Sequence, residues 1–328
     1  MARVGVQDDA PGWCVAVWYP SADMPGGLDS IRANADLIGI VHPFWYAPLA
    51  DGTLETVDED ADLLAEWRAL GMTIIPSIRA GFSQEIVDPA VRAFHIQTII
   101  DLVERMDYDG IDIDYESFPL ATRDDFSTFI EALSEVLHAR GKLLTIAVHA
   151  KTDDAGTWEG AAAQDWMRIA PAVDVFTIMT YDYTSSNRPP GPIAPPDWVR
   201  AVLRYAATVT DLGKVRMGLH YYGYSWVRDN PPATNVSWAE VERLIESFGV
   251  EILRDPADME AHLSFKARGL PKRTIYVADS AGIEYKLQAV LAEFPQLGGV
   301  AIWGIGGEDP ANWDVLRAAR PAHCTLTT

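Results

Sequence analysis

Three acidic residues, Asp112, Asp114 and Glu116, lie at every second position of one short stretch of the chain. Side chains alternate between the two faces of a β-strand, so the three carboxylates would share one face, roughly 6.6 Å apart at a rise of about 3.3 Å per residue. The opposite face would carry apolar and aromatic side chains, namely Ile111, Ile113 and Tyr115. Because that face predicts packing against a core, the acidic face is expected to look into a cavity, a metal site or a substrate.

Several roles are open to such a row of carboxylates. A single carboxylate at a strand end usually pairs with Lys or Arg or caps a helix, but three on one face of an apolar strand favour a site with chemistry. A divalent metal would need further carboxylates at other strand ends. The residues expected at those ends are mostly aromatic or basic, namely Trp45, Arg79, His149, Tyr181, Asp182, His220, Tyr222 and Trp303. We therefore expect no metal, since the two histidines also lack a metal-ligand spacing.

Cleavage of a glycosidic bond suits the row better. That reaction needs a carboxylic acid of raised pKa to protonate the leaving oxygen, and crowding of three carboxylates keeps a proton among them near neutral pH. A conventional carboxylate pair flanks the sugar from two sides, whereas Asp114 and Glu116 would rise from one strand. An N-acetyl group on the substrate can supply the attacking atom instead, with Asp114 holding the amide and Glu116 acting first as acid and then as base.

The elements around this row repeat in a regular order. Short apolar runs alternate with stretches long enough for an amphipathic helix, which is typical of βα units and a parallel sheet. The expected strands are 14–19, 37–44, 72–78, 110–116, 143–149, 173–181, 215–221 and 298–303, and the clearest helices are 58–70, 89–105, 123–140 and 196–210. Eight such units predict an α/β protein with a (β/α)₈ TIM barrel, in which active sites lie at the C-terminal ends of the strands. Glu116 would be the last residue of its strand.

One interval is too long for a single crossover, because residues 222–297 separate the seventh and eighth expected strands. Ser237 followed by Glu240 predicts a capping box and a helix that ends near Phe248. Residues 250–253 and 274–277 are expected as strands around a polar segment at 255–266, and 282–294 as the last barrel helix. The sequence therefore predicts a small α+β insertion lobe at 228–280 on a barrel formed by 1–227 and 281–328.

The composition describes a globular protein with an acidic surface. The chain has 328 residues, and 48% of them are hydrophobic, which gives ample core. Its net charge of −21 argues against nucleic acid or an anionic membrane as a partner. No apolar run reaches the roughly 18 to 20 residues of a membrane helix, and residues 1–9 lack the apolar core of a signal peptide. We expect a monomer without a cofactor, either cytoplasmic or, if the sequence is trimmed, from the cell wall or exterior.

The two cysteines of the chain, Cys14 and Cys324, lie near its opposite ends. The ends of a closed barrel can be neighbours, so a disulfide between them is open. Two unrelated free thiols are nevertheless the favoured expectation.

Residues 109–116 resemble the DxxDxDxE signature of glycoside hydrolase family 18, the chitinase-like (β/α)₈ enzymes. That family uses substrate-assisted catalysis. The resemblance implies that Glu116 is the proton donor, that Asp114 orients the acetamido group of the substrate and that Asp112 exchanges a proton with Asp114.

A second stretch, residues 179–182, is similar to another element of the same family. The resemblance implies that Tyr181 donates a hydrogen bond to the acetamido oxygen and that Met179 and Asp182 line the same subsite. Trp303 stands where the family places an aromatic floor beneath the reacting sugar. The predicted insertion lobe is similar in position to a small domain of many members, where it deepens the cleft.

A finer resemblance is to a bacterial branch that includes spore-cortex-lytic N-acetylglucosaminidases. It is carried by residues 43–46, 218–224, 279–287 and 302–310, and it makes Tyr222 and Trp45 further candidates for substrate binding. The chain departs from that branch at His149 and His220, where proline is usual, and at residues 77–81, which lack the usual asparagine. The wall-binding LysM repeats often attached to that branch are absent from this sequence.

The resemblance implies a retaining glycosidase that cleaves β-1,4 bonds after N-acetylglucosamine in chitin oligomers or peptidoglycan glycan. An endo-β-N-acetylglucosaminidase acting on N-glycans would need the same acetamido chemistry and stays open as an alternative. A chitinase-like protein that binds carbohydrate without cleaving it is a third interpretation. Such proteins typically change the acid, and Glu116 is present, which argues against it.

Overall fold

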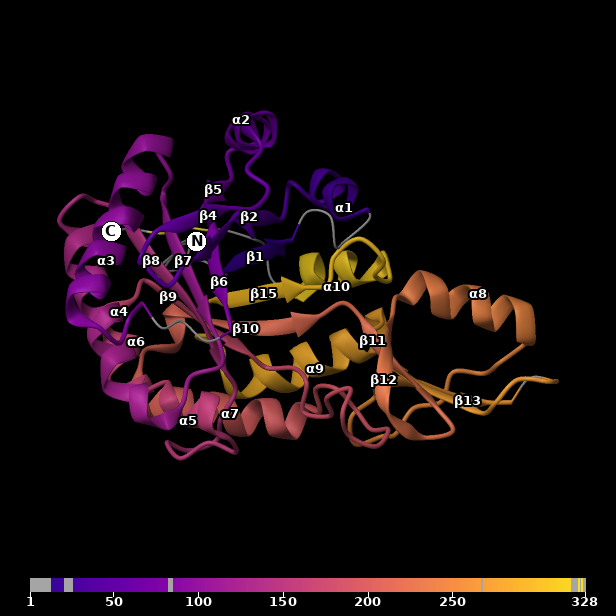
Figure 1. Cartoon of the computed structure of the whole chain (residues 1–328). Helices are drawn as coiled ribbons and strands as arrows, with labels where there is room; N and C mark the ends of the chain where they lie inside the picture. The colour runs from indigo at the N-terminus through magenta and orange to yellow at the C-terminus, as the bar shows by residue number, and fades with distance from the viewer. Residues whose placement is uncertain are drawn as a thin grey trace, which may run out of the picture.

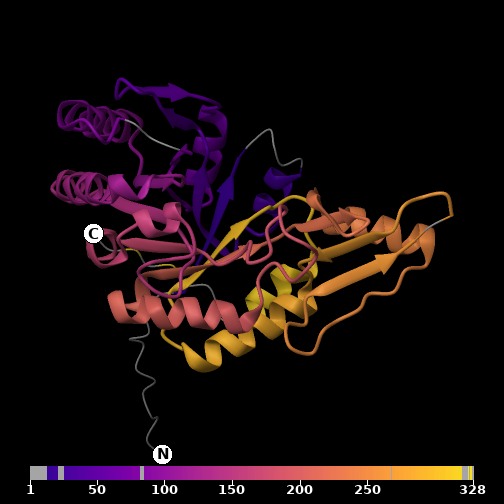
Figure 2. The ribbon, with the colours of Figure 1, turned by 60° about the horizontal axis from the view of Figure 1, so that its bottom comes forward.

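The computed structural model describes residues 13–20, 26–81, 85–266, 268–319, 324 and 326. A ring of parallel strands stands at its centre, helices surround the ring, and a smaller sheet projects to one side (Figure 1). The turned view shows the same division between the ring and the projecting sheet (Figure 2). Residues 1–9, where the sequence shows no signal-peptide core, lie outside the described residues. Of the helices in the described ranges, none combines the length and apolarity that a membrane crossing requires.

The parallel strands are neighbours in the order β6-β7-β8-β9-β10-β15-β1-β2-β5. Their bounds are β1 (Cys14–Tyr19), β2 (Ile38–Pro43), β5 (Thr73–Ile74), β6 (Ser77–Ala80), β7 (Gly110–Tyr115), β8 (Leu143–His149), β9 (Val175–Met179), β10 (Val215–His220) and β15 (Gly299–Trp303). Seven expected strands are confirmed to within two residues at each end. The third, expected at 72–78, is divided into β5 and β6. A short hairpin, β3 (Tyr46–Pro48) and β4 (Leu54–Thr56), extends the sheet beside β6.

The divided third strand closes the ring. Pro76 lies between β5 and β6 and has no N–H to donate. The pairing nevertheless continues through the break, because the N–H of Ile75 donates to the carbonyl of Val41 in β2 and the N–H of Asp112 in β7 donates to the carbonyl of Pro76. With β5 paired to β2 and β6 paired to β7, the strands form the predicted (β/α)₈ barrel.

Helices cover the outside of the ring. Their bounds are α1 (Gly27–Ala33), α2 (Ala61–Ala69), α3 (Pro89–Met106), α4 (Arg123–His138), α5 (Glu159–Ala163), α6 (Trp166–Ala172), α7 (Pro196–Val209), α9 (Ser280–Glu293) and α10 (Ala311–Ala319), with 3-10 turns at Leu120–Thr122 and Leu212–Lys214. The carboxylates of Asp60, Asp88 and Asp165 accept N–H groups from the first turns of α2, α3 and α6, which fixes where these helices begin. The helices expected as the clearest, α2, α3, α4 and α7, are confirmed.

A four-stranded antiparallel sheet, in the order β12-β11-β14-β13, forms the projecting part of the molecule. Its strands are β11 (Gly223–Val227), β12 (Asn230–Val236), β13 (Ala261–Phe265) and β14 (Arg273–Val277), and helix α8 (Trp238–Phe248) packs on it. The predicted capping box is confirmed, because Ser237 and Glu240 exchange their hydrogen bonds at the start of α8. The boundaries 228–280 for a separate lobe stay a prediction, and the sheet itself begins at Gly223.

The predicted position of one strand of this sheet is wrong. Residues 250–253 are not a strand, and Leu253 makes only an isolated bridge to His262. The strand is β13, which lies inside the segment expected to be polar and irregular. Its Ala261 and Leu263 alternate with polar neighbours and are fully buried against Ile275 of β14, so this short alternation was the signal that the overall polarity concealed.

Cys14 and Cys324 form a disulfide, with Cα atoms 4.5 Å apart. The expectation of two unrelated free thiols is therefore wrong. Cys14 begins β1 and is fully buried, and Cys324 packs over β2 at Gly39, where a Cβ would lie 2.6 Å from the Cβ of Cys324. Only closure of the ring brings together two residues separated by 310 positions in sequence.

Replacement of Cys324 by serine is expected to lower the free energy of unfolding by about 2–5 kcal/mol, because the disulfide restricts an unfolded chain over nearly its whole length. Denaturant unfolding of the wild type and the variant, each with and without reductant, measures this loss. Reductant should destabilise the wild type by a similar amount and leave Cys324→Ser unchanged. A wild-type midpoint that is the same in both conditions would contradict the prediction.

Candidate active site

The acidic row lies at the C-terminal end of β7, on the inner face of the barrel. Asp112 and Asp114 are buried, with 1% and 4% of their surface exposed, while the Glu116 side chain is 27% exposed. The strand ends at Tyr115 rather than at Glu116, which is the first residue beyond it. The N–H of Glu116 still donates to the carbonyl of Ala80, the last residue of β6, so the one-residue difference leaves Glu116 held at the mouth of the barrel.

Asp112 is the deepest of the three and is held by its neighbours in the barrel. The hydroxyls of Ser77 and Thr145 each donate to it at 2.6 Å, and the indole N–H of Trp18 donates at 3.3 Å. These donors come from the flanking strands β6 and β8 and from β1. Both carboxylate oxygens are therefore satisfied inside the protein, and Asp112 lies below the cavity rather than in its wall.

Asp114 is the most perturbed carboxyl of the row. Its Oδ1 atom is buried without a hydrogen-bond partner in the described part of the protein. Burial raises the pKa of Asp114 well above its ordinary value, and the charges of Glu116 and Asp112 raise it further, against a smaller opposing effect of Arg79. Asp114 therefore keeps a proton to a higher pH than an ordinary carboxyl does.

Arg79 lies over the acidic row from the end of β6. Its Nε atom is 3.7 Å from an oxygen of Asp114 and 3.6 Å from an oxygen of Glu116, and its guanidinium lies 5.6 Å from the ring centre of Phe44. The arginine side chain is 54% exposed, so water weakens these ion pairs. Arg79 is thus a partly exposed counter-charge at the mouth of the barrel rather than a buried partner. Arg79 lies within residues 77–81, where the sequence departs from the bacterial branch that includes spore-cortex-lytic enzymes.

A small cavity of about 160 Å³ opens above Asp114. Its walls are formed by Trp18, Phe44, Arg79, Asp114, Glu116, Met179, Tyr181, Asp182 and Trp303. The rings of Phe44 and Trp303 stack with centres 5.4 Å apart and give it a flat aromatic side. A flat apolar face opposite a carboxyl pair is suited to one sugar ring.

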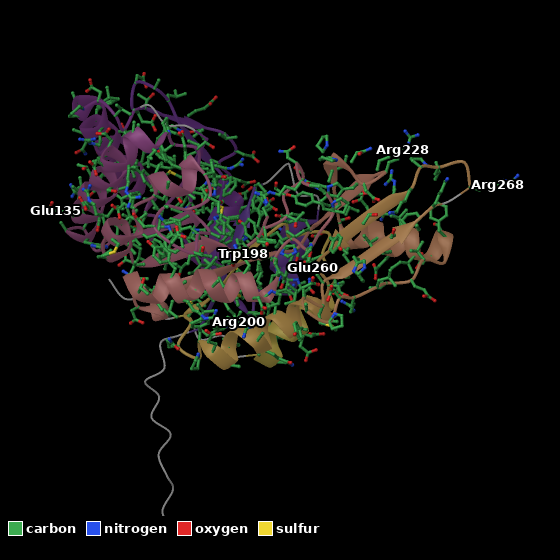
Figure 3. The ribbon with its side chains drawn as sticks, turned by 90° about the horizontal axis from the view of Figure 1, so that it is seen from below. Glu135, Trp198, Arg200, Arg228, Glu260 and Arg268 are labelled. Atoms are coloured by element: carbon green, nitrogen blue, oxygen red, sulfur yellow. A yellow bond between two sulfur atoms is a disulfide. The ribbon has the colours of Figure 1, made fainter. Side chains whose placement is uncertain are left out.

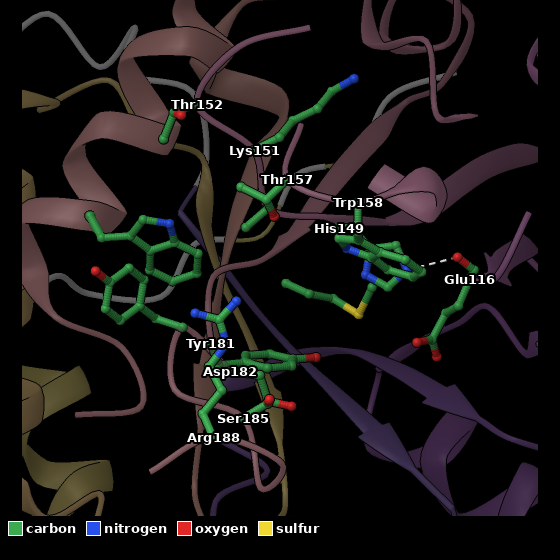
Figure 4. A pocket seen from close by; sticks show the side chains of 14 residues that line it. Glu116, His149, Lys151, Thr152, Thr157, Trp158, Tyr181, Asp182, Ser185 and Arg188 are labelled. Atoms are coloured by element: carbon green, nitrogen blue, oxygen red, sulfur yellow. Dashed lines mark hydrogen bonds between the residues drawn. The ribbon is translucent and has the colours of Figure 1, made fainter. Parts of the chain in front are cut away.

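A wider cavity of about 420 Å³ adjoins the small one and shares Glu116, Met179, Tyr181 and Asp182 with it (Figure 4). Its remaining walls come from the end of β8, the loops after β8 and β9 and the start of α7, namely His149, Ala150, Lys151, Thr152, Thr157, Trp158, Tyr183, Ser185, Arg188 and Trp198. Glu116 therefore stands at the junction of two compartments, which is where a glycosidic oxygen joining two sugars would lie.

Most of the predicted site residues come together in these compartments. Tyr181 and Met179 line both, and Trp303 lines the smaller one. Burial raises the pKa of Tyr181 well above its ordinary value, and the charge of Asp114 raises it further, so the phenol remains a hydrogen-bond donor. Tyr222 stands behind the wall, where its hydroxyl donates to Asp182 at 2.7 Å.

The structure does not bring Trp45 to the site. Its side chain is completely buried and stacks on Trp67 of α2, with ring centres 5.7 Å apart. Strand β2 ends at Pro43, and of the two aromatic residues that follow, Phe44 turns into the cavity while Trp45 turns outward beneath the helix. The expectation that Trp45 lies at the site is therefore wrong, and Phe44 is the member of this adjacent pair that lines the cavity.

The two histidines have separate structural roles. The ring Nε2 of His149 is 2.8 Å from the carbonyl oxygen of Glu116, to which it donates, and Trp158 packs against the ring at 4.6 Å (Figure 4). Burial lowers the pKa of His149, which favours this neutral donor. His220 is fully buried, with Nε2 3.6 Å from Glu260. Within the described residues, no group of three or more His, Cys, Asp or Glu side chains is arranged to hold a metal ion.

Sequence reasoning missed several residues of the walls. Phe44, Arg79 and His149 follow or end expected strands, so their position was available as a signal, but no role was assigned to them. Trp158 and Arg188 lie in the loops after β8 and β9 and belong to no motif. Only the fold places these loops beside Glu116.

Comparison with known proteins gives a match over residues 71–308 to the family model described as glycosyl hydrolases family 18. The chain is 35% identical over 179 residues to YdhD of Bacillus subtilis, whose name describes a sporulation-specific glycosylase, and the match covers 53% of this chain and 42% of that protein. It is 26% identical over 302 residues to the cortical fragment-lytic enzyme of Bacillus anthracis, covering 88% of this chain and 70% of the relative. This chain thus spans less than half the length of YdhD.

Among solved structures, the fold is similar to that of a chitinase from Chromobacterium violaceum. The TM-score is 0.85 at 21% sequence identity, and the match covers 94% of this chain and 98% of that one. At this identity the likeness concerns the fold.

Proposed function

Since the chain belongs to the glycosyl hydrolases family 18, we propose that it is a retaining glycosidase whose substrate supplies its own nucleophile through an N-acetyl group. The observation that carries this proposal is the placement of Asp114 and Glu116 on one wall of the small cavity, from a single strand end. The third carboxylate of that cavity, Asp182, accepts the hydroxyls of Tyr222 and Tyr224. An attacking group from the opposite face of the sugar is then best provided by the sugar itself.

In the first proposed step the acetamido oxygen attacks the anomeric carbon, and the bond from that carbon to the glycosidic oxygen breaks. Glu116 gives its proton to the departing oxygen. Asp114 holds the acetamido N–H and balances the positive charge of the oxazolinium ion, while Tyr181 donates to the acetamido oxygen. Asp112, fixed from below by Ser77 and Thr145, exchanges a proton with Asp114.

In the second proposed step Glu116, now ionised, takes a proton from a water molecule while the oxygen of that water attacks the anomeric carbon. The oxazolinium ring opens, the acetamido group is restored, and two displacements give net retention of configuration. The sugar ring would lie against Trp303 and Phe44 in the small cavity, with Met179 beside it. The steps need no cofactor.

The proposed substrates are glycans in which N-acetylglucosamine precedes a β-1,4 bond, as in chitin oligomers and peptidoglycan glycan. The names of the relatives support this class, since one is a cortical fragment-lytic enzyme and a structural neighbour is a chitinase.

We expect wild-type protein to hydrolyse chitooligosaccharides or peptide-free peptidoglycan glycan and to leave cello-oligosaccharides and fully de-N-acetylated chitosan oligomers intact, because those sugars lack the attacking group. Product analysis by mass spectrometry, with the anomer ratio followed by NMR, measures specificity and stereochemistry together. A high-mannose glycopeptide in the same panel tests for action on N-glycans. Cleavage of the de-N-acetylated oligomers, or inversion, would refute the mechanism. Binding of all N-acetylated glycans without turnover would identify a binding protein instead.

A further inference from the structure

The wider cavity contains a cation whose role the proposed chemistry does not explain. Arg188 lies in the loop after β9, and its exposed side chain extends into the cavity toward the space between Tyr181 and His149 (Figure 4). Within the described part of the chain, its guanidinium has neither an ion pair nor a hydrogen bond to a side chain. In a protein of net charge −21, such an unpaired cation inside a cavity is suited to an anionic ligand.

The other cation of this cavity is not available to a ligand. Lys151 is 1% exposed, and its ammonium group donates to the backbone carbonyls of Gln164 and Asp154. Its charge is also 3.5 Å from the carboxylate of Asp154. Lys151 therefore supports the loop after β8, and Arg188 is left to interact with what enters the cavity.

The loop that carries Arg188 is held by the projecting sheet. The indole N–H of Trp226 in β11 donates to the carbonyl of Arg188 at 2.7 Å, and the N–H of Ala233 in β12 donates to the carbonyl of Ser186 at 2.8 Å. Further along the loop, the buried carboxylate of Glu260 accepts the N–H groups of residues 193 and 194. The backbone of Arg188 is thus already ordered, so binding a ligand would cost little further conformational entropy of the main chain.

The surroundings of Arg188 are suited to a sugar. Trp158 and Tyr183 are each 47% exposed, and Trp198 packs against Tyr183 with ring centres 5.3 Å apart. Exposed aromatic faces provide stacking surface for sugar rings. The carboxylates present in the same cavity are Glu116, needed as the acid, and Asp182, whose Oδ1 accepts two tyrosine hydroxyls.

We propose that this cavity binds the leaving-group sugar and that Arg188 recognises a carboxylate carried by that sugar. The inference rests on the proposed function, which places the N-acetylated sugar in the small cavity and the scissile oxygen at Glu116. A guanidinium pairs with a carboxylate through two parallel hydrogen bonds, which a neutral sugar hydroxyl cannot match. The carboxylate can come from a lactyl ether, as on muramic acid, or from C6 of a uronic acid.

The test compares kcat/KM on oligosaccharides of equal length whose leaving-group sugar carries a lactyl carboxylate, the same group as its methylamide, a uronic acid, or no acidic group. We expect wild type to prefer one carboxylate over its neutral counterpart by at least about 10-fold, and the preferred arm identifies the source. Arg188→Gln should remove the preference, because it should lower kcat/KM on the carboxylate-bearing substrate by more than it lowers kcat/KM on chitooligosaccharide. Arg188→Lys should keep part of the preference. Added salt should weaken the preference in wild type and in Arg188→Lys, and should have no such effect in Arg188→Gln.

Arg228→Gln is the matched control, because it removes one positive charge from the projecting sheet, away from Trp198 and the cavity (Figure 3). It should leave the preference intact. Equal losses on acidic and neutral substrates in Arg188→Gln, or no preference in wild type, would overturn the proposal.

Binding of uncleaved oligosaccharides by Glu116→Gln separates recognition from turnover. If wild type cleaves nothing but this variant still discriminates the carboxylate through Arg188, the proposed function fails and the inference stands. If wild type cleaves chitooligosaccharides and neither assay shows discrimination, the inference fails and the function stands.

Discussion

Glu116→Gln is expected to lower kcat/KM on a chitooligosaccharide by on the order of 10³-fold, about 4 kcal/mol of transition-state stabilisation. The amide keeps the shape of the side chain but has no proton to give to a sugar leaving group. Glu116 lines both cavities, which places its carboxyl beside the expected position of the scissile oxygen. Steady-state kinetics on purified variant and wild type measure the loss.

A change of leaving group tests the role of Glu116 directly. The leaving group of a dinitrophenyl glycoside is dinitrophenolate, which departs without protonation. The value of kcat/KM on this substrate should therefore fall far less in Glu116→Gln than kcat/KM on an oligosaccharide. Both constants report the first irreversible step, in which this residue acts as the acid. Equal losses on the two substrates would show that Glu116 does not donate the proton. The substrate affinity of the variant serves as a control for folding and binding.

Asp114→Asn is expected to have two opposite effects. Activity should fall by on the order of 10²-fold or more, because an amide cannot balance the charge of the oxazolinium ion. This loss should be similar on the oligosaccharide and on the dinitrophenyl glycoside, since both reactions need the acetamido group. That pattern distinguishes Asp114 from Glu116 in one experiment.

The stability of the Asp114→Asn variant is expected to rise, in contrast to its activity. The pKa of Asp114 is raised by burial and by its acidic neighbours, so above the ordinary carboxyl pKa the folded state binds more protons than the unfolded state. The contribution of Asp114 to wild-type stability is therefore expected to fall as pH rises from about 4 through the folded pKa of Asp114. Asparagine does not titrate, so the variant should gain stability relative to wild type over that window.

Thermal unfolding of Asp114→Asn and wild type from pH 4 to pH 8 measures this gain. The difference in midpoint should be smallest at pH 4 and should grow with pH until the folded pKa is passed. Asp29→Asn, a change at a side chain that is 88% exposed, is the control and should show no such trend. A variant that is destabilised more at pH 8 than at pH 4 would contradict the raised pKa.

Much of the barrel could be predicted from local pattern. Strands such as 143–149 and helices such as 123–140 combine clear apolar periodicity with clear ends, and the structure confirms them. The division of the third strand could not be predicted this way, because the effect of Pro76 depends on which neighbours pair on each side of it. In the projecting sheet, the short alternation of β13 was concealed by the polar residues around it.

The site was likewise predictable where local pattern decides and unpredictable where tertiary contacts decide. The alternation of Asp112, Asp114 and Glu116 was enough to predict three carboxylates on one face of an inner strand, and the structure has Asp112 and Asp114 in β7 with Glu116 directly after its end. Trp45 shows the limit of such reasoning, because at the end of a strand neither periodicity nor motif indicates which of two adjacent aromatic residues turns inward.

The sequence by itself therefore determined the barrel, the acidic row and the class of chemistry, since all three depend on residues close together in the chain. Tertiary structure decided which groups surround that row: the donors that hold Asp112, Arg79 above Asp114, the loop that presents Arg188, and the disulfide of Cys14 with Cys324. These contacts join residues far apart in sequence, and closure of the ring and packing of the second sheet bring them together. Local propensity carries no information about such contacts.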